Sequence, residues 1–206
     1  PGYDNNRLTN TMDSAYYAEL NRDKSSPLYS RATQEQTAPG STFKPVVAAA
    51  ALEEGVTTPS ETIHATGVFT EAYGSPTCWI YNQYHGSHGS INMVEAIKVS
   101  CNYYFYEMGF RLGGGRTTGY SSDRALAVLA EYAGQFGLDA TTGIEVPENE
   151  PHLSDTDGVR SSIGQGTHLF SVSQLARYAA TIANRGTSYN LTLLNKLTDS
   201  EGNTIE

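Results

Sequence analysis

The chain has 206 residues, of which 38% are hydrophobic and 17% are charged, the size and composition of one globular domain. Its formal net charge of −9 argues against nucleic acid and anionic membrane surfaces as partners. It contains no apolar run long enough to span a bilayer, and it begins at Pro1 without a methionine or a signal-like segment. We therefore expect a segment excised from a larger protein.

Helical signals dominate the first half of the chain. A helix is predicted at residues 13–20, with Asp13 as its N-cap. An alanine-rich helix is predicted at residues 41–54, and it ends where Gly55 can adopt the left-handed C-terminal conformation. A third helix is predicted to begin at Ser90, which would cap a run with apolar residues at helical spacing, namely Ile91, Val94 and Ile97.

The second half continues this pattern. After a break at residues 100–102, helices are predicted at 103–112 and 122–136, and glycines follow both. The last helix begins at Ser171, which has Gln174 three residues later as in a capping box, and it ends at Gly186. Its predicted core-facing stripe consists of Leu175, Tyr178, Ala179 and Ile182.

Strand signals are sparse and occur near the end of the chain. They are confined to residues 189–197, and residues 199–203 follow as a predicted turn. A middle rich in helices, with extended segments at the margins, predicts a helical subdomain cut from an α+β protein.

The two cysteines, Cys78 and Cys101, have neither the spacing of a metal site nor that of a disulfide framework. One bridge between them is possible and an unpaired pair is favoured, so cysteine usage leaves the compartment open. His85 and His88 could form a metal pair, but the sequence offers no third ligand nearby and their surroundings are loop-like. We therefore expect no metal ion and no organic cofactor.

The segment Pro39-Gly40-Ser41-Thr42-Phe43-Lys44-Pro45 carries the most chemical information. Gly40 permits a sharp turn into the predicted helix, and Lys44 lies one turn after Ser41 on the same face. A serine hydroxyl is a weak nucleophile and needs a base within hydrogen-bond distance. Burial and the positive end of the helix would both lower the pKa of Lys44 toward neutrality, and the Ser41 N–H could stabilise an oxyanion. Ser-x-x-Lys occurs once in the chain.

A second element is Ser100-Cys101-Asn102, at the junction of two predicted helices. Ser-x-Asn also occurs at residues 90–92 and 188–190, so the tripeptide alone has little specificity. A short turn between helices can direct both a hydroxyl and an amide into a cleft. Ser100 could then pass a proton between the lysine and a leaving amine, while Asn102 holds a substrate amide.

Ser-x-x-Lys followed by Ser-x-Asn resembles the serine acyltransferases that react with penicillin. The whole chain is similar to the transpeptidase domain of class B penicillin-binding proteins, within the serine D,D-peptidase and β-lactamase-like superfamily. Besides residues 39–45 and 100–102, the segments that resemble this domain in order and spacing are 1–6, 27–32, 136–138 with 142–144, 162–166 and 183–186.

One departure from the family pattern is the third element. No Lys-Thr-Gly or Lys-Ser-Gly occurs in the chain. In the family that element lies on a sheet strand, which also supplies the second oxyanion N–H. The resemblance therefore implies a partial transpeptidase domain at residues 1–206, mainly the helical subdomain of an α+β fold, with most of the central antiparallel sheet missing at both ends.

The function implied by the resemblance is peptidoglycan cross-linking. Ser41 would form an acyl-enzyme with a stem peptide or a β-lactam, with Lys44, Ser100 and Asn102 as the other catalytic residues and Ser41 and Asn102 contacting substrate. Other cell-wall synthesis proteins are expected partners. The expected location is the outer face of the bacterial cell membrane, through an N-terminal anchor outside this chain.

Two alternatives remain open. A carboxypeptidase, a β-lactamase or a β-lactam sensor would keep the chemistry and change the acceptor from an amine to water. The transpeptidase is favoured because no deacylating base is visible: Glu145 and Asn149 have the spacing of such a pair, but Pro147 interrupts them. The other alternative is a non-catalytic fragment that lacks the Lys-Thr-Gly strand.

Overall fold

The computed structural model describes residues 2–9 and 12–205. Its α-helices are α1 (Ser14–Arg22), α2 (Lys44–Glu53), α3 (Trp79–Tyr84), α4 (Met93–Lys98), α5 (Asn102–Leu112), α6 (Ser122–Gln135), α7 (Gly158–Ser161) and α8 (Val172–Ala183). Two 3₁₀ turns occupy Asn5–Arg7 and Gly40–Phe43. The strands are β1 (Gln36–Thr37), β2 (Ile63–Ala65), β3 (Gly89–Ile91) and β4 (Phe170–Ser171). The predicted mixture of many helices and few strands is confirmed.

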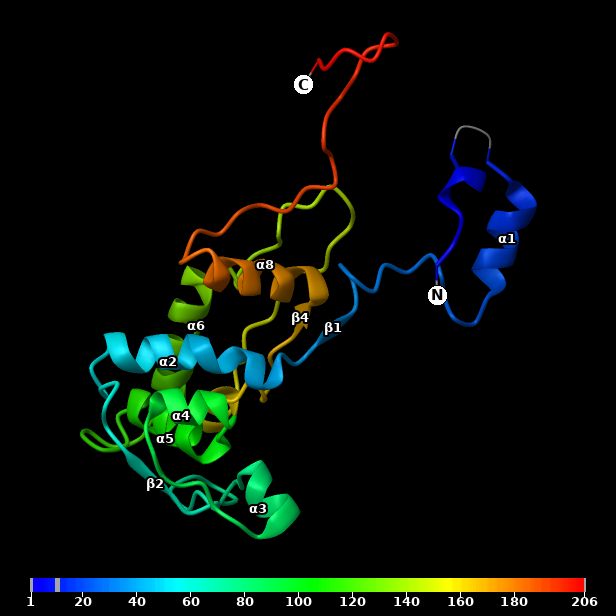
Figure 1. Ribbon diagram of the computed structural model, residues 1–206. Helices are drawn as coiled ribbons and strands as arrows, with labels where there is room; N and C mark the ends of the chain where they lie inside the picture. The colour runs from blue at the N-terminus through cyan, green and yellow to red at the C-terminus, as the bar shows by residue number, and fades with distance from the viewer. Residues whose placement is uncertain (1, 10–11, 206) are drawn as a thin grey trace.

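Helix α2 lies at the centre of the helical body, between α8 on one side and α4 and α5 on the other (Figure 1). Its alanines and valines are buried almost all round, as expected for a helix enclosed by others. The core joins α2 and the turn before it to α5 through buried side chains: Phe43, Val46, Val47, Ala50, Tyr104, Phe105 and Met108. Because Phe43 is part of this core, the turn that precedes α2 is held by packing on its inner side.

The two small sheets are antiparallel. Strand β1 pairs with β4 in the register Gln36↔Ser171 and Thr37↔Phe170. Strand β2 pairs with β3, so that His64 lies opposite Ser90. The first pairing matters for the site, because β1 ends shortly before the Gly40–Phe43 turn and β4 leads directly into α8. The chain segment that leads to Ser41 is therefore hydrogen-bonded to the segment that leads into α8.

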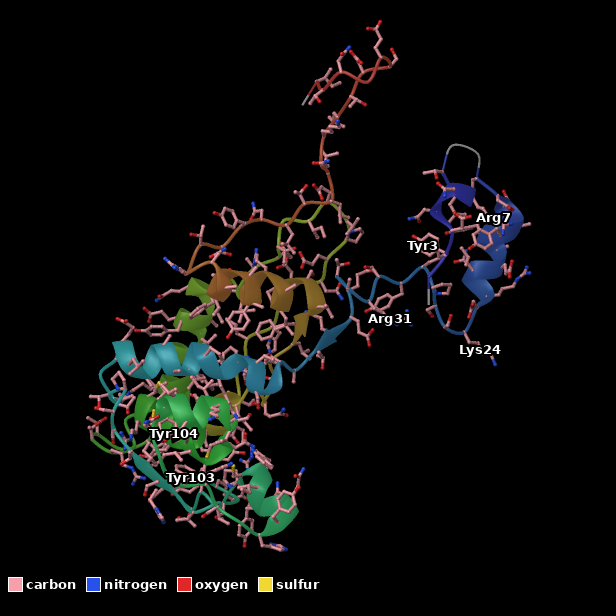
Figure 2. All side chains as sticks on the ribbon, in the orientation of Figure 1. Tyr3, Arg7, Lys24, Arg31, Tyr103 and Tyr104 are labelled. Carbon is pink, nitrogen blue, oxygen red and sulfur yellow. The ribbon has the colours of Figure 1, made fainter. Side chains whose placement is uncertain are left out.

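The two ends of the chain lie away from the helical body (Figure 1). Residues 2–9 and helix α1 form a separate lobe. Figure 2 shows Tyr3 and Arg7 on this lobe and Arg31 in the segment that connects it to the body. Residues 187–205 lead away from α8. Within the described ranges, no helix combines the length and the apolar character that a membrane crossing needs.

Several predicted helix boundaries are confirmed by their caps. Asp13 caps α1 by accepting a hydrogen bond from the Tyr16 N–H at 3.0 Å. Ser171 and Gln174 form the predicted capping box of α8. Helix α6 begins at the predicted residue, and Ser121 provides its cap. These signals are local in sequence, and local hydrogen bonds satisfy them in the structure.

The prediction that Ser90 caps a helix is wrong. Residues Gly89–Ile91 form β3, and Asn92 caps α4 through a capping box with Glu95. The predicted apolar face is also displaced, because Val94 is 69% exposed and Ile97 is 43% exposed. The pairing of β3 with β2 takes up the backbone hydrogen bonds of residues 89–91, so the helix can begin only after Ile91.

The predicted strand at residues 189–197 does not form. In residues 187–205 the structure has one isolated bridge, Thr198↔Thr204, and no neighbouring strand pairs with the rest. Leu193 and Leu194 are accordingly 67% and 51% exposed. The predicted turn that follows is confirmed, since the Asp199 N–H donates to the Asn203 carbonyl at 2.9 Å.

The predicted apolar stripe of α8 is only partly buried. Tyr178 is buried, but Ala179 and Ile182 are exposed. The buried face instead carries polar groups, because Arg177 donates to the carbonyls of Gly137, Ala140 and Thr141. A buried polar side chain is tolerated where hydrogen bonds of this kind replace water.

Candidate active site

The predicted nucleophile lies on a tight turn rather than inside an α-helix. Gly40–Phe43 is a 3₁₀ turn, and α2 begins at Lys44 with Pro45 in its first turn. A 3₁₀ turn has 3.0 residues per turn, so the side chains of residues i and i+3 eclipse. The turn therefore brings the side chains of Ser41 and Lys44 to the same edge, with Ser41 exposed and Lys44 buried.

The Gly40–Phe43 turn is held in place on its buried side. The Phe43 ring lies 4.5 Å from the His168 ring and 6.5 Å from the Phe170 ring, measured between centroids. Burial lowers the pKa of His168 to about 4, so at neutral pH this ring is uncharged and packs as an aromatic group. The Tyr178 hydroxyl of α8 donates to the Thr42 carbonyl at 2.9 Å. The backbone around Ser41 is thus fixed by both packing and hydrogen bonding.

The second predicted element lies directly opposite. Ser100 occupies the junction of α4 and α5 in the left-handed region, with φ of 52°. A non-glycine residue in this region carries a strain of about 1–2 kcal/mol, which the surrounding structure must hold in place. This conformation directs both the carbonyl and the hydroxyl of Ser100 to the Lys44 amine, at 2.9 Å and 3.0 Å.

The Lys44 amine is the centre of the cluster. Besides Ser100 it contacts Asn102, the first residue of α5, whose Oδ1 accepts its hydrogen bond at 2.7 Å. Lys44 is only 2% exposed, and burial lowers its pKa to about 8. The amine is therefore much closer to neutrality at physiological pH than an ordinary lysine, as expected from its predicted burial.

Ser41 joins this cluster through Ser100. The Ser100 and Ser41 hydroxyl oxygens are 3.0 Å apart. Among the hydrogen bonds of the described residues, none joins Lys44 to Ser41 directly, so the predicted direct contact is replaced by one that runs through the Ser100 hydroxyl. Since hydroxyl protons rotate freely, either of the two hydroxyls can donate the hydrogen bond to the other. The structure brings all four predicted site residues together in one hydrogen-bonded chain.

A glycine contact that sequence reasoning missed sets the position of the turn. The Gly40 N–H donates to the Gly164 carbonyl at 3.0 Å. Gly164 has φ of 72°, and a Cβ placed on it would lie 2.0 Å from the Gly40 carbonyl oxygen. Only glycine fits this close approach between two backbones. The signal available in the sequence was the glycine pair at 164 and 166.

Substitution of Gly164 by alanine is expected to displace Gly40 and with it Ser41. Overpacking of this kind costs about 1–3 kcal/mol, in addition to the strain of a side chain at positive φ. We expect a lower melting temperature together with slower covalent labelling of Ser41 by penicillin. Gly119→Ala is the matched control, since Gly119 has φ of 93° and a Cβ on it would meet nothing within 4 Å. Equal effects of the two substitutions would contradict this account.

The cysteines form a second cluster beside the first. Cys78 and Cys101 are buried free thiols whose sulfur atoms are 3.9 Å apart, and His88 Nδ1 lies 3.6 Å from the Cys78 sulfur. The hydrogen bond between the two sulfur atoms lowers the pKa of the Cys78 thiol. The premise that His88 has no third ligand nearby was therefore wrong, because the ligand atoms of these three residues lie within 4.8 Å of one another. Sulfur and imidazole ligands of this kind could hold a metal ion such as zinc.

Glu145, which has the sequence spacing of a deacylating glutamate, has a structural role, and so does its neighbour Glu148. Glu145 is exposed and accepts hydrogen bonds from Leu193 and Thr192, and the Leu193 N–H lowers its pKa to about 2. Glu148 accepts hydrogen bonds from Thr142 and Ser173. Both groups fix neighbouring segments, and neither forms a hydrogen bond to the residues around Ser41.

The comparison with known proteins agrees with this geometry. The sequence matches the family described as the penicillin-binding protein transpeptidase domain over residues 1–206. The chain belongs to this family. It is 30% identical over 201 residues to the peptidoglycan D,D-transpeptidase MrdA of Haemophilus influenzae, with 90% of this chain and 29% of the relative covered.

Two solved structures resemble the fold of this penicillin-binding transpeptidase domain. Penicillin-binding protein A from M. tuberculosis, in an imipenem acyl-enzyme complex, has a TM-score of 0.78 and 27% identity over 100% of this chain and 46% of its own. A chain of a peptidoglycan synthase complex has a TM-score of 0.77 and 31% identity over 94% of this chain and 33% of its own. The predicted family and fold are thus confirmed, and the chain spans less than half the length of these relatives.

Proposed function

We propose that the protein containing this chain is a peptidoglycan D,D-transpeptidase, in which Ser41 is the nucleophile. The observation that carries the proposal is the chain of contacts from a buried, pKa-lowered Lys44 through Ser100 to an exposed Ser41. The name of the MrdA relative supports the reaction class. The acyl-enzyme of penicillin-binding protein A supports acylation by β-lactams.

In the acylation step, the Ser41 oxygen attacks the carbonyl carbon between the two terminal D-alanines of a stem peptide. The Ser41 proton passes to the Ser100 oxygen while the Ser100 proton passes to the neutral Lys44 amine. The amine can accept that proton because its two N–H groups can remain on the Ser100 carbonyl and Asn102 Oδ1. The Ser41 N–H, on the turn before α2, is one donor to the oxyanion.

Collapse of the tetrahedral intermediate breaks the peptide bond. The Lys44 ammonium returns its proton through Ser100 to the leaving nitrogen, and D-alanine departs with an ester left on Ser41. An amine from a neighbouring stem peptide then attacks this ester, and Ser100 and Lys44 take up the amine proton as they took up that of Ser41. The second tetrahedral intermediate then collapses, the proton on Lys44 returns through Ser100 to the departing Ser41 oxygen, and a new peptide bond forms as the Ser41 hydroxyl is regenerated.

The cellular setting follows from the same proposal. Stem peptides and β-lactams are the small partners, and the synthase complex among the structural relatives supports other cell-wall synthesis proteins as macromolecular ones. The reaction proceeds on the outer face of the bacterial cell membrane, with an anchor that precedes this chain. The chemistry of the four residues requires no metal or organic cofactor.

The test is covalent labelling with a fluorescent penicillin, followed by peptide mass spectrometry. We expect a label on Ser41 and none in Ser41→Ala. Incubation of the full-length protein with a D-Ala-D-Ala donor and an amine acceptor should then give the cross-linked amide. A hydrolysed donor in place of the amide would indicate a carboxypeptidase, and no label on the full-length protein would contradict an acylating function.

Acylation is expected to depend on pH through Lys44. Since burial lowers the pKa of Lys44 to about 8, the fraction of neutral amine falls about tenfold for each pH unit below that value. The acylation rate constant should therefore rise between about pH 6 and pH 8 and become level above about pH 9. Stopped-flow measurement with a chromogenic cephalosporin checks this profile. A flat profile over the same range would exclude Lys44 as the base.

A further inference from the structure

Ser100 occupies a position at the end of α4 that glycine usually takes. The Cys101 N–H donates back to the Ala96 carbonyl at 2.9 Å, and the Ser100 N–H donates to the Ile97 carbonyl at 3.1 Å. This pair of bonds is the Schellman motif, whose left-handed residue is most often glycine. Here that residue is Ser100, with φ of 52°. The catalytic hydroxyl is therefore carried by the strained residue of the motif, and its direction depends on what holds the backbone there.

The backbone groups on both sides of Ser100 need partners from outside α4 and α5. The Val99 carbonyl is among the last carbonyls of one helix and the Asn102 N–H is among the first N–H groups of the next, and such groups have no partner within their own helix. The indole N–H of Trp79 donates to the Val99 carbonyl at 3.1 Å. The Asn102 N–H donates to the Cys78 sulfur at 3.2 Å. Two adjacent residues at the start of α3 thus hold the chain before and after Ser100.

The bond from Trp79 acts on the dihedral angle that directs the Ser100 side chain. The Val99 carbonyl belongs to the rigid peptide plane between Val99 and Ser100, and that plane turns only when the ψ of Val99 and the φ of Ser100 change together. These angles are 4° and 52°. Release of the carbonyl would let the plane turn and Ser100 leave the left-handed region, which would relieve its strain. The hydroxyl would then point away from the Lys44 amine.

The indole is held by contacts of its own. Trp79 is half-buried and packs against the hydrophobic core, and its ring meets the His88 ring edge-on with 5.5 Å between centroids. The Cys78 N–H, at the start of α3, donates to the Gly67 carbonyl at 2.8 Å. An indole N–H is a donor only and takes no part in proton transfer. Its place beside the Val99 carbonyl therefore serves position and not chemistry.

We propose that Trp79 is a positioning residue for acylation. Its indole N–H holds the Val99 carbonyl and thereby keeps Ser100 in the left-handed conformation. The Ser100 hydroxyl then stays between the Lys44 amine and the Ser41 hydroxyl. The proposal rests on the proposed transpeptidase function, in which this hydroxyl passes the proton. Because the indole acts through Ser100, its loss should matter only while residue 100 carries a hydroxyl.

The experiment is a double-mutant cycle on the full-length protein with Trp79→Phe, Ser100→Ala and their combination. Stopped-flow reaction with a fluorescent penicillin gives the acylation rate constant and the dissociation constant of the complex that precedes it. We expect Trp79→Phe alone to lower the rate constant about ten- to a hundredfold and to leave the dissociation constant unchanged. In the Ser100→Ala background, the same change should cost less than about twofold, because residues that act as a unit are not additive.

Two further variants separate the hydrogen bond from the packing of α3. With 3-benzothienylalanine in place of Trp79, sulfur replaces the indole N–H while the ring keeps its shape, so this variant retains the packing if Trp79→Phe does not fold. It should show the same loss of rate. Tyr84→Phe changes another aromatic residue of α3. Tyr84 is 72% exposed and takes part in no hydrogen bond of the described residues, so normal acylation is expected.

Each outcome decides between the two proposals. Normal acylation by the benzothienylalanine variant would overturn the role of Trp79. Equal losses from Trp79→Phe with and without the Ser100 hydroxyl would also overturn it, because a merely structural effect is additive. Both results leave the transpeptidase function standing. Failure of penicillin to acylate the unaltered full-length protein would overturn that function and the role of Trp79 together.

Discussion

Replacement of Lys44 by methionine is expected to slow acylation of Ser41 by about a hundred- to ten-thousandfold, the usual contribution of a positioned general base. Methionine has nearly the length and volume of the lysine stem, so it can fill the space beneath the Gly40–Phe43 turn. It lacks the amine that joins Ser100 to Asn102. The acylation rate constant with a fluorescent penicillin, measured by quenched time points, reports the loss.

A second lysine provides the control for this substitution. Lys98, in α4, is exposed and takes no part in the Ser100 contacts, so Lys98→Met removes the same charge without touching the cluster. We expect that variant to acylate at the normal rate. The melting temperature of Lys44→Met separates loss of the base from loss of the fold. Acylation of Lys44→Met within tenfold of normal would mean that another group accepts the Ser41 proton.

The parts of the site that can be predicted from the sequence are those in which the interacting residues lie only a few positions apart in the chain. Ser41 and Lys44 are three residues apart, and any helical turn places them on one edge. The capping box of α8 is local for the same reason. The start of α4 could also be predicted from the sequence. Asn92 has Glu95 three residues later, and this capping-box pattern is a stronger cap signal than Ser90 alone. Ser90 lies two residues earlier and its side chain could also cap a helix, but its backbone is in β3.

Other features depend on tertiary contacts that no local pattern encodes. Gly40 and Gly164 meet from distant parts of the chain, and the close approach of their backbones leaves no trace in either segment beyond the glycine itself. The same holds for the Cys78, His88 and Cys101 cluster, whose sequence spacing matches no metal motif. The buried face of α8 was predicted from apolar residues, but Arg177 is buried there because three carbonyls from residues 137–141 accept its hydrogen bonds.

A buried carboxylate on α5 gives the second large prediction. Glu107 accepts hydrogen bonds from Arg111 Nε at 2.7 Å and from Arg116 Nε and Nη2 at 2.9 Å and 2.7 Å. Its side chain is 4% exposed, whereas those of Arg111 and Arg116 are 18% and 45% exposed. Arg111 also pairs with Glu61, and so this network ties the helix that begins at Asn102 to the loop after α2.

Because Glu107 is more deeply buried than its two arginines, replacing the arginines should destabilise the fold more than replacing Glu107. In the double variant that combines Arg111→Met and Arg116→Met, the Glu107 carboxylate stays buried without its cations. The free energy of unfolding should therefore fall by about 3–5 kcal/mol. In Glu107→Leu the charges left behind are arginines, of which one reaches solvent and the other keeps Glu61. The expected loss there is smaller, about 1–2 kcal/mol. Urea unfolding of the two variants at pH 7 measures both values.

The comparison of the two variants identifies the cause. A larger loss in the double variant would mean that the buried Glu107 carboxylate depends on its two cations. Equal losses for both variants would mean that the network contributes packing alone.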